Sequence, residues 1–159
     1  MLMAVVQEGE VMKLEEATSI DFFIPCNPPK STHQAALRIL KRHDGTQFVG
    51  KFASSKGKRV ETELMTLFMP YRPPAPLSGP LHLAVFWRYP WRKSEKKTNI
   101  AKGPMWCDTR PDCDNLSKFV CDIMTRLAFW HDDSQVAVLA FRKQWCSDPG
   151  IGIHVKELT

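Results

Sequence analysis

The chain has little of what zinc-stabilised, secreted or membrane proteins depend on. Its five cysteines form no Cys-x-x-Cys pair and its five histidines show no ligand spacing, so a structural zinc site is not expected. No apolar run is long enough to span a bilayer, and no signal-peptide pattern or internal repeat is visible. The odd number of cysteines suits a reducing compartment. We therefore expect a reduced, cytoplasmic protein with no membrane segment.

Length and charge narrow the class of protein further. With 159 residues, of which 43% are hydrophobic and 25% charged, the chain suits one soluble domain. We expect residues 19–159 to form this domain and residues 1–18 to be an N-terminal extension. The net charge of +5 favours a polyanionic partner such as nucleic acid. Two basic runs could bind phosphates, with a solvated loop as the alternative for each: Arg88, Arg92, Lys93, Lys96, Lys97 and Lys102, and Lys51, Lys56, Lys58 and Arg59.

The spacing of apolar residues predicts both strands and helices. Alternation predicts strands over residues 19–25, 47–53, 80–89, 135–145 and 151–156, and Asp148-Pro149-Gly150 predicts a hairpin turn between the last two. Helical spacing predicts a helix over residues 56–69, another through Leu116–Leu127, and a short one over residues 35–41. This order favours an α+β, two-layer domain in which helices pack on one face of a mixed β-sheet.

Acidic residues gather at both ends of the Leu116–Leu127 helix. Asp112 and Asp114 precede it, and Asp114, Lys118 and Asp122 follow one another at four-residue intervals along one ridge. A helix cap explains one aspartate at the start but not two. Asp132 and Asp133 follow the helix, where a solvated turn is the plain alternative. Hard cations such as Mg²⁺ prefer carboxylates that converge with substrate phosphate, so metal-dependent chemistry on nucleic acid is predicted.

These residues carry a family resemblance. The segment Arg110-Pro-Asp-Cys-Asp-Asn-Leu-Ser-Lys118, then Cys121-Asp-Ile-Met124 and Phe129-Trp-His-Asp-Asp-Ser-Gln-Val136, resembles the RusA-type Holliday junction resolvases. Phe22-Phe-Ile-Pro-Cys-Asn-Pro-Pro29 looks like the opening strand and turn of the same family. Departures from the usual pattern are the extra N-terminal residues and a long insertion between the strand at residues 80–89 and Asp112.

The resemblance implies a magnesium-dependent endonuclease, with Mn²⁺ as a substitute, that acts as a homodimer on four-way DNA junctions and uses no other small-molecule cofactor. Asp112, Asp114 and Asp133 would be catalytic acids and metal ligands, Lys118 a catalytic lysine, and Asp122 and Asp132 supporting residues. We expect the first basic run, together with Arg110 and Trp106, to bind DNA, with Trp106 or Met105 as a wedge between bases.

Two other functions stay open at this point. A general metal-dependent nuclease or flap hydrolase could use the same acids. A basic DNA-binding module could carry the acidic cluster without catalysis, although none of the three motif aspartates is missing. Cleavage tests on different DNA substrates separate these alternatives.

Overall fold

The computed structural model describes residues 18–30, 36–52 and 55–158, so nearly all of the predicted N-terminal extension lies outside the described residues. Among the described residues no helix is both long enough and apolar enough to cross a membrane. The strands are β1 (Ser19–Pro25), β2 (Ala36–Lys41), β3 (Gln47–Phe52), β4 (Leu81–Pro90), β5 (Met105–Trp106), β6 (Val136–Cys146) and β7 (Gly150–Glu157). The helices are α1 (Ser55–Phe68), α2 (Lys97–Ile100) and α3 (Cys113–Arg126), with 3₁₀ turns η1 (Met69–Tyr71) and η2 (Asp133–Gln135).

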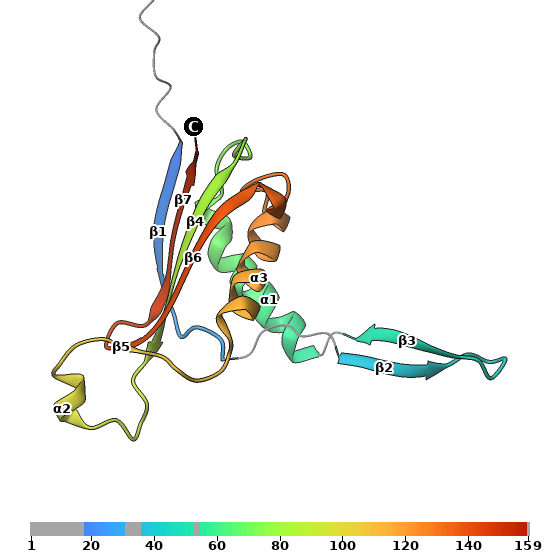
Figure 1. Cartoon of the computed structure of the whole chain (residues 1–159), viewed down its shortest axis with the longest axis horizontal. Coiled ribbons are helices and arrows are strands. Elements are labelled where there is room, and N and C mark those ends of the chain that lie inside the picture. The colour runs from blue at the N-terminus through green and yellow to red at the C-terminus, as the bar shows by residue number, and fades with distance from the viewer. Residues whose placement is uncertain (1–17, 31–35, 53–54, 159) are drawn as a thin grey trace, which may run out of the picture.

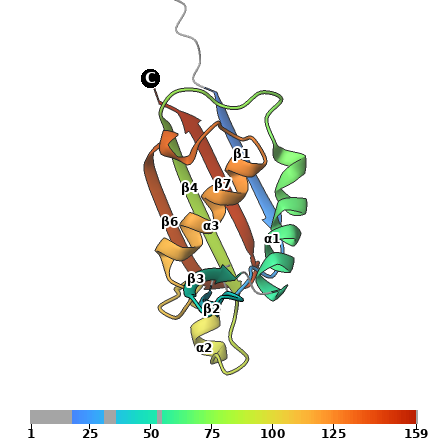
Figure 2. The ribbon, with the colours of Figure 1, turned by 90° about the vertical axis from the view of Figure 1, so that its right-hand side faces the viewer.

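The body of the protein is a five-stranded mixed sheet with helices on one face. Its strand order is β1-β7-β4-β6-β5, in which β4 and β6 are parallel and all other neighbours antiparallel. A parallel pair needs a crossover, and the segment from α2 through α3 supplies it. Helices α1 and α3 both cover the same face of the sheet (Figures 1 and 2). The predicted two-layer α+β fold is confirmed.

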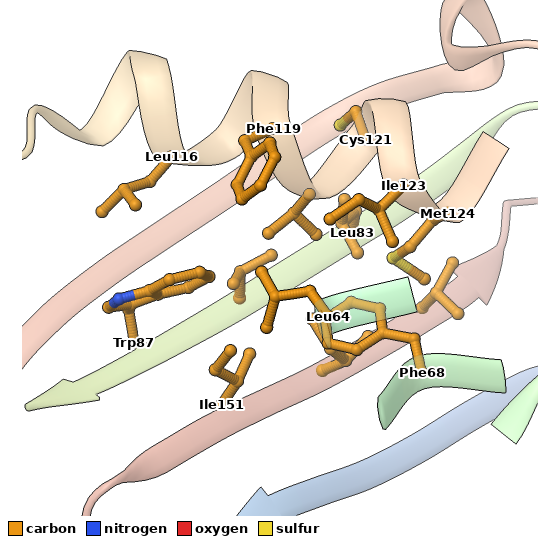
Figure 3. Close-up of a cluster of buried hydrophobic side chains, with 14 of the residues drawn as sticks. Leu64, Phe68, Leu83, Trp87, Leu116, Phe119, Cys121, Ile123, Met124 and Ile151 are labelled. Carbon is orange, nitrogen blue, oxygen red and sulfur yellow. The ribbon is translucent and has the colours of Figure 1, made fainter. Parts of the chain in front are cut away.

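The core lies between α3 and the central strands, because both contribute regularly spaced apolar side chains. Leu116, Val120, Ile123 and Met124 of α3 are fully buried, as the helical spacing predicts. They pack over the inward residues of β4 and β7 together with side chains from α1 (Figure 3). Burial of such side chains contributes about 1.5–3 kcal/mol each, so α3 is held firmly on the sheet. The acids at its start stand on a rigid element.

The predicted helix over residues 35–41 is wrong within the described part, where residues 36–41 form strand β2. This strand pairs antiparallel with β3 in a separate two-stranded sheet, which extends away from the body (Figure 1). The cause is the turn between the strands: Gly45 has a φ of 85°, and the Asp44 carboxylate accepts a bond of 2.9 Å from the Thr46 N–H. An Asp-Gly turn is a strong hairpin signal.

The predicted hairpin of the last two strands is also wrong. Strands β6 and β7 are not neighbours, because β4 lies between them and pairs with both. The turn at residues 147–149 therefore crosses the end of β4, where Arg88 forms an ion pair with Asp148. Turn residues show that the chain reverses direction, but they do not fix which strand becomes the neighbour.

Candidate active site

Two carboxylates stand at the start of α3. Asp112 is the N-cap residue, with φ −74° and ψ 150°, but its side chain makes no capping hydrogen bond. Asp114 lies in the first turn, and both side chains are exposed. In the part of the chain that the structure describes, neither carboxylate is engaged in a hydrogen bond or ion pair. The positive end of the helix dipole favours negative charge here. The pair is therefore available to a cation or to substrate water.

The approach to α3 is fixed by a strand residue that the sequence reasoning missed. The Nζ of Lys143 in β6 donates to the carbonyl oxygens of Thr109 and Pro111, at 2.6 and 2.8 Å. The Cys107 N–H donates to the Lys143 carbonyl at 3.1 Å. Lys143 pairs in register with Trp87, whose side chain is buried under the helices, so Lys143 also points to the helix face. The signal that could have found it is a charged residue at an inward position of a strand.

Lys118 lies one turn beyond Asp114 on α3 and contacts Asp122. Their Nζ and Oδ1 atoms are 3.6 Å apart, and the two side chains are 73% and 44% exposed. An exposed pair of this kind contributes little, about 0.3–0.5 kcal/mol. Lys118 can therefore leave Asp122 at small cost.

The two aspartates after the helix have different roles. The Asp132 carboxylate accepts a bond of 2.9 Å from the Ser134 N–H, and hydrogen bonds from Ser134 lower the pKa of Asp132. Gln135 completes a capping box by accepting from the Asp132 N–H at 3.1 Å, and its amide donates to the Gly79 carbonyl at 3.0 Å. Asp133 is exposed and its carboxylate takes no part in this network. Asp132 is thus occupied in shaping η2, whereas Asp133 is free.

One chain does not bring all three acids together. Helix α3 has 14 residues, which corresponds to about 21 Å, and Asp133 follows its far end. The anchor Lys143 and the first residue of β6, Val136, are seven strand residues apart, or roughly 23 Å. Among the described residues, no group of three His, Cys, Asp or Glu side chains is placed to hold a metal ion. Within the described part of one chain, Asp133 is therefore not brought together with Asp112 and Asp114.

Asp133 lies closer to the later part of α3 than to the acid pair. Burial raises the pKa of the Cys121 thiol to about 11, and the negative charges of Asp133 and Asp122 add to this effect. Such an influence requires Asp133 to lie near Cys121, which is two helical turns beyond Asp114. Asp133 therefore lies within electrostatic range of Cys121 in the later part of α3.

The basic residues divide into those that form ion pairs and those that do not among the described residues. Arg88 pairs with Asp148, and Arg92 pairs with Glu95 at 2.9 Å and lies over the Trp145 ring. The loop around α2 extends from the end of the sheet at which α3 begins (Figure 1). The predicted DNA-binding residues that are exposed and form no ion pair in the described part of the chain are Lys93, Lys96, Lys97, Lys102, Trp106 and Arg110. On α1, Arg59 pairs with Glu63 while Lys56 and Lys58 are exposed, and the side chain of Lys51 lies outside the described part.

Comparison with known proteins identifies the family. The family model described as endodeoxyribonuclease RusA matches residues 17–156. An uncharacterized protein, YqaN, of Bacillus subtilis (strain 168) is 29% identical over 110 residues, covering 66% of this chain and 77% of that protein. The crossover junction endodeoxyribonuclease rusA of Lactococcus phage r1t is 40% identical over 53 residues, which cover 33% of this chain and 40% of the phage protein. The chain belongs to the RusA family of endodeoxyribonucleases.

Proposed function

We propose that this protein is a magnesium-dependent endonuclease that resolves four-way DNA junctions by paired phosphodiester hydrolysis. The observation that carries the proposal is the free acid pair, Asp112 and Asp114, at the start of a firmly packed helix in a chain of net charge +5. An exposed lysine-bearing loop extends from the same end of the sheet. Membership of the family supports an activity on DNA.

The residues at this end of the molecule suit hydrolysis of a phosphodiester. When bound, magnesium supplies counter-charge for the phosphate and makes a bound water more acidic. Asp112 and Asp114 would hold the ion and leave room for substrate oxygens, as Mg²⁺ sites commonly do. Lys118 would turn from Asp122 toward the phosphate and offset the charge that develops there. Mn²⁺ has similar ligand preferences and should substitute.

Binding to the DNA backbone would come from the exposed lysines. Lys93, Lys96, Lys97 and Lys102 surround α2 without a carboxylate partner among the described residues. Contacts of lysine with phosphate are independent of base sequence and weaken with salt. They would hold a junction in place while its branched shape determines which strands reach the acids. Arg110, next to the acid pair in sequence, would contact a phosphate closer to the cut.

Resolution of a junction also requires two equivalent cuts. Two opposed strands are related by the two-fold symmetry of the junction, so two active sites related by a two-fold axis suit this substrate. We therefore propose that the working form is a homodimer.

The test is cleavage of a labelled synthetic four-way junction beside linear duplex and flap controls, with and without Mg²⁺. The wild type should make symmetric paired nicks in the junction alone, and Asp114→Asn should lose them while it still binds. Asp21→Asn is the matched control, because Asp21 is an exposed acid on β1 that pairs with His154 away from α3. Equal cutting of every substrate would indicate a general nuclease or flap hydrolase. Binding without any cutting would indicate a DNA-binding module.

A further inference from the structure

The face of the main sheet opposite to the helices, which we call the outer face, is open. Helices α1 and α3 lie on one side of the sheet, and no described helix or strand covers the other side (Figures 1 and 2). One row of residues crosses the outer face. Phe23 of β1 pairs with Gly152 of β7, which also pairs with Phe86 of β4. Phe86 in turn pairs with Arg142 of β6.

Two phenylalanine rings stay exposed in this row. The exposed fractions of Phe23 and Phe86 are 39% and 37%. Gly152 keeps the space between them open, because a Cβ atom at this position would lie only 3.3 Å from the Cβ of Phe86. A recess of about 280 Å³ results, lined by Phe23, Phe86, Arg88, Arg142, Gln144 and Gly152. Exposed rings beside a recess suit a ligand with flat apolar faces.

Each ring has a positive charge beside it. The guanidinium carbon of Arg142 lies 5.2 Å from the centre of the Phe86 ring, and that of Arg88 lies 5.4 Å from the centre of the Phe23 ring. Arg88 pairs with Asp148, whereas Arg142 is exposed and forms no ion pair within the described ranges. A nucleotide combines a flat base with a negative phosphate, so a ring beside a guanidinium group complements both parts.

Trp106 extends the row to the edge of the sheet. It pairs in register with Gln144, which lines the recess, so its side chain lies on the outer face as well. Its exposed fraction is 68%. Four strand spacings separate β1 from β5, or about 19 Å. We call the whole group the outer-face platform: Phe23, Phe86, Arg88, Trp106 and Arg142.

We propose that the outer-face platform binds a strand of unpaired DNA, whose bases stack on the three aromatic rings and whose phosphates contact the two arginines. Bases in a duplex already stack on one another, so only an unpaired strand offers its base faces to a row of this length. Exposed aromatic residues and positive charges on a sheet are the combination by which single strands are bound without sequence preference.

The charges favour this occupant over an apolar protein segment. A protein that covered the rings would also remove Arg142 from water, and a buried charge without a partner is costly. A DNA strand supplies the partner with its own phosphate. The proposal goes beyond the proposed function, because binding on the outer face needs neither the acid pair nor cleavage.

The test of stacking is a fluorescence anisotropy titration of the full chain with a labelled oligothymidine of about 12 nucleotides, without divalent metal. Phe86→Leu keeps an apolar side chain but removes the ring, so it should weaken binding by about fivefold or more. Phe86→Tyr should bind as the wild type does. Phe48→Leu is the matched control, because Phe48 is 41% exposed with Arg42 over its ring, but lies in the separate β2–β3 sheet. It should leave the affinity unchanged.

The salt dependence of the same titration tests the phosphate contacts. Arg142→Gln should weaken binding and lower the slope of log affinity against log salt by about 0.7, the value for one phosphate contact on a single strand. Phe86→Leu should lower the affinity at an unchanged slope, because stacking releases no counterions. Arg42→Gln is the control for the charge and should change neither quantity. Both platform variants should keep the wild-type unfolding temperature, since the two side chains are exposed.

Three results would overturn the platform. The first is a wild type that does not bind the oligonucleotide. The second is an affinity that Phe86→Leu leaves unchanged, or lowers no more than Phe48→Leu does, as expected if a protein partner occupies the outer face. The third is an equal loss of affinity for a duplex of the same length. Junction cleavage enters none of these measurements, so a chain that binds the oligonucleotide as described but leaves junctions uncut would support the platform and contradict only the proposed function.

Discussion

The Nζ of Lys143 lies 2.8 Å from the carbonyl oxygen of Pro111, and this bond ties the approach to α3 to strand β6. Asp112 follows Pro111 directly and begins the helix. The position of the acid pair therefore depends on a strand residue that is distant in sequence. Lys143 acts through the backbone it holds, so we regard it as a positioning residue.

Lys143→Met should displace the acid pair without unfolding the protein. A hydrogen bond from a charged group contributes about 1.5–3 kcal/mol, and displacement of a site by about 1 Å can cost on the order of 100-fold in rate. We expect junction cleavage to fall by about 10–100-fold and Mn²⁺ affinity to fall with it. Lys143→Arg should restore part of both. Lys156→Met, at an exposed strand lysine of β7, is the control and should change neither. Unchanged Mn²⁺ affinity in Lys143→Met would contradict the positioning role.

The parts of the fold that follow from regular periodicity could be predicted from the sequence. The apolar stripe of α3 and the alternation of β4 each reflect burial of one face, which is visible in a single segment. The β2–β3 hairpin was missed because a short apolar run fits helix and strand equally well. The neighbours of β7 could not be predicted, because strand order depends on packing across the whole sheet.

The candidate site, like the fold, could be predicted from the sequence only in part. The types and order of its acids indicated the chemistry, and the capping box at Asp132 separates the structural aspartate from the free one. Sequence spacing predicted the helix between Asp114 and Asp133, but the expectation that the three acids share one site did not allow for its length of about 21 Å. Lys143 was missed because its role depends on a contact between a strand and a loop far apart in the chain.

The two neighbouring aspartates of η2 should respond differently to the same substitution. Asp133→Asn should reduce cleavage by more than the ~10–100-fold typical of residues that only support a metal ligand, with an unchanged unfolding temperature. Asp132→Asn should keep most activity, because asparagine also accepts the bond from the Ser134 N–H. Equal losses in the two variants would contradict the separation of roles.

The capping role of Asp132 also predicts a dependence of stability on pH. Hydrogen bonds from Ser134 lower the pKa of Asp132 in the folded state. Its contribution to stability is therefore full above the pKa of the unfolded chain and is lost as pH falls through the folded value. Asp132→Asn removes this titration, so thermal unfolding of wild type and variant should converge on acidification from neutral pH to about 3. A constant difference across that range would show that Asp132 does not cap as an ion.

The exposed lysines around α2 should determine the salt dependence of DNA binding. Removal of one lysine–phosphate interaction lowers the slope of log affinity against log salt by about 0.9 on duplex DNA. The double variant Lys96→Gln, Lys97→Gln should therefore bind junction arms more weakly and with a shallower slope in a titration from low to moderate salt. Lys156→Gln should match the wild type. A weaker affinity with an unchanged slope would mean that the lysines act through the structure of the loop.

Trp106 is 68% exposed in the short strand β5, at the end of the sheet where α3 begins. Exposure of a large apolar side chain to water is unfavourable. Insertion of the Trp106 ring between two stacked bases of the junction, as a wedge, would give this exposed side chain a function. Unstacking a step costs a few kcal/mol, so Trp106→Ala should slow cleavage of an intact junction by about tenfold or more. On a junction with unpaired bases at the crossover, Trp106→Ala should cleave as fast as the wild type, because the bases there are already unstacked. Trp106→Phe should retain most activity on both substrates. Equal losses of Trp106→Ala on the intact and the pre-opened junction would show a general contact and rule out the wedge.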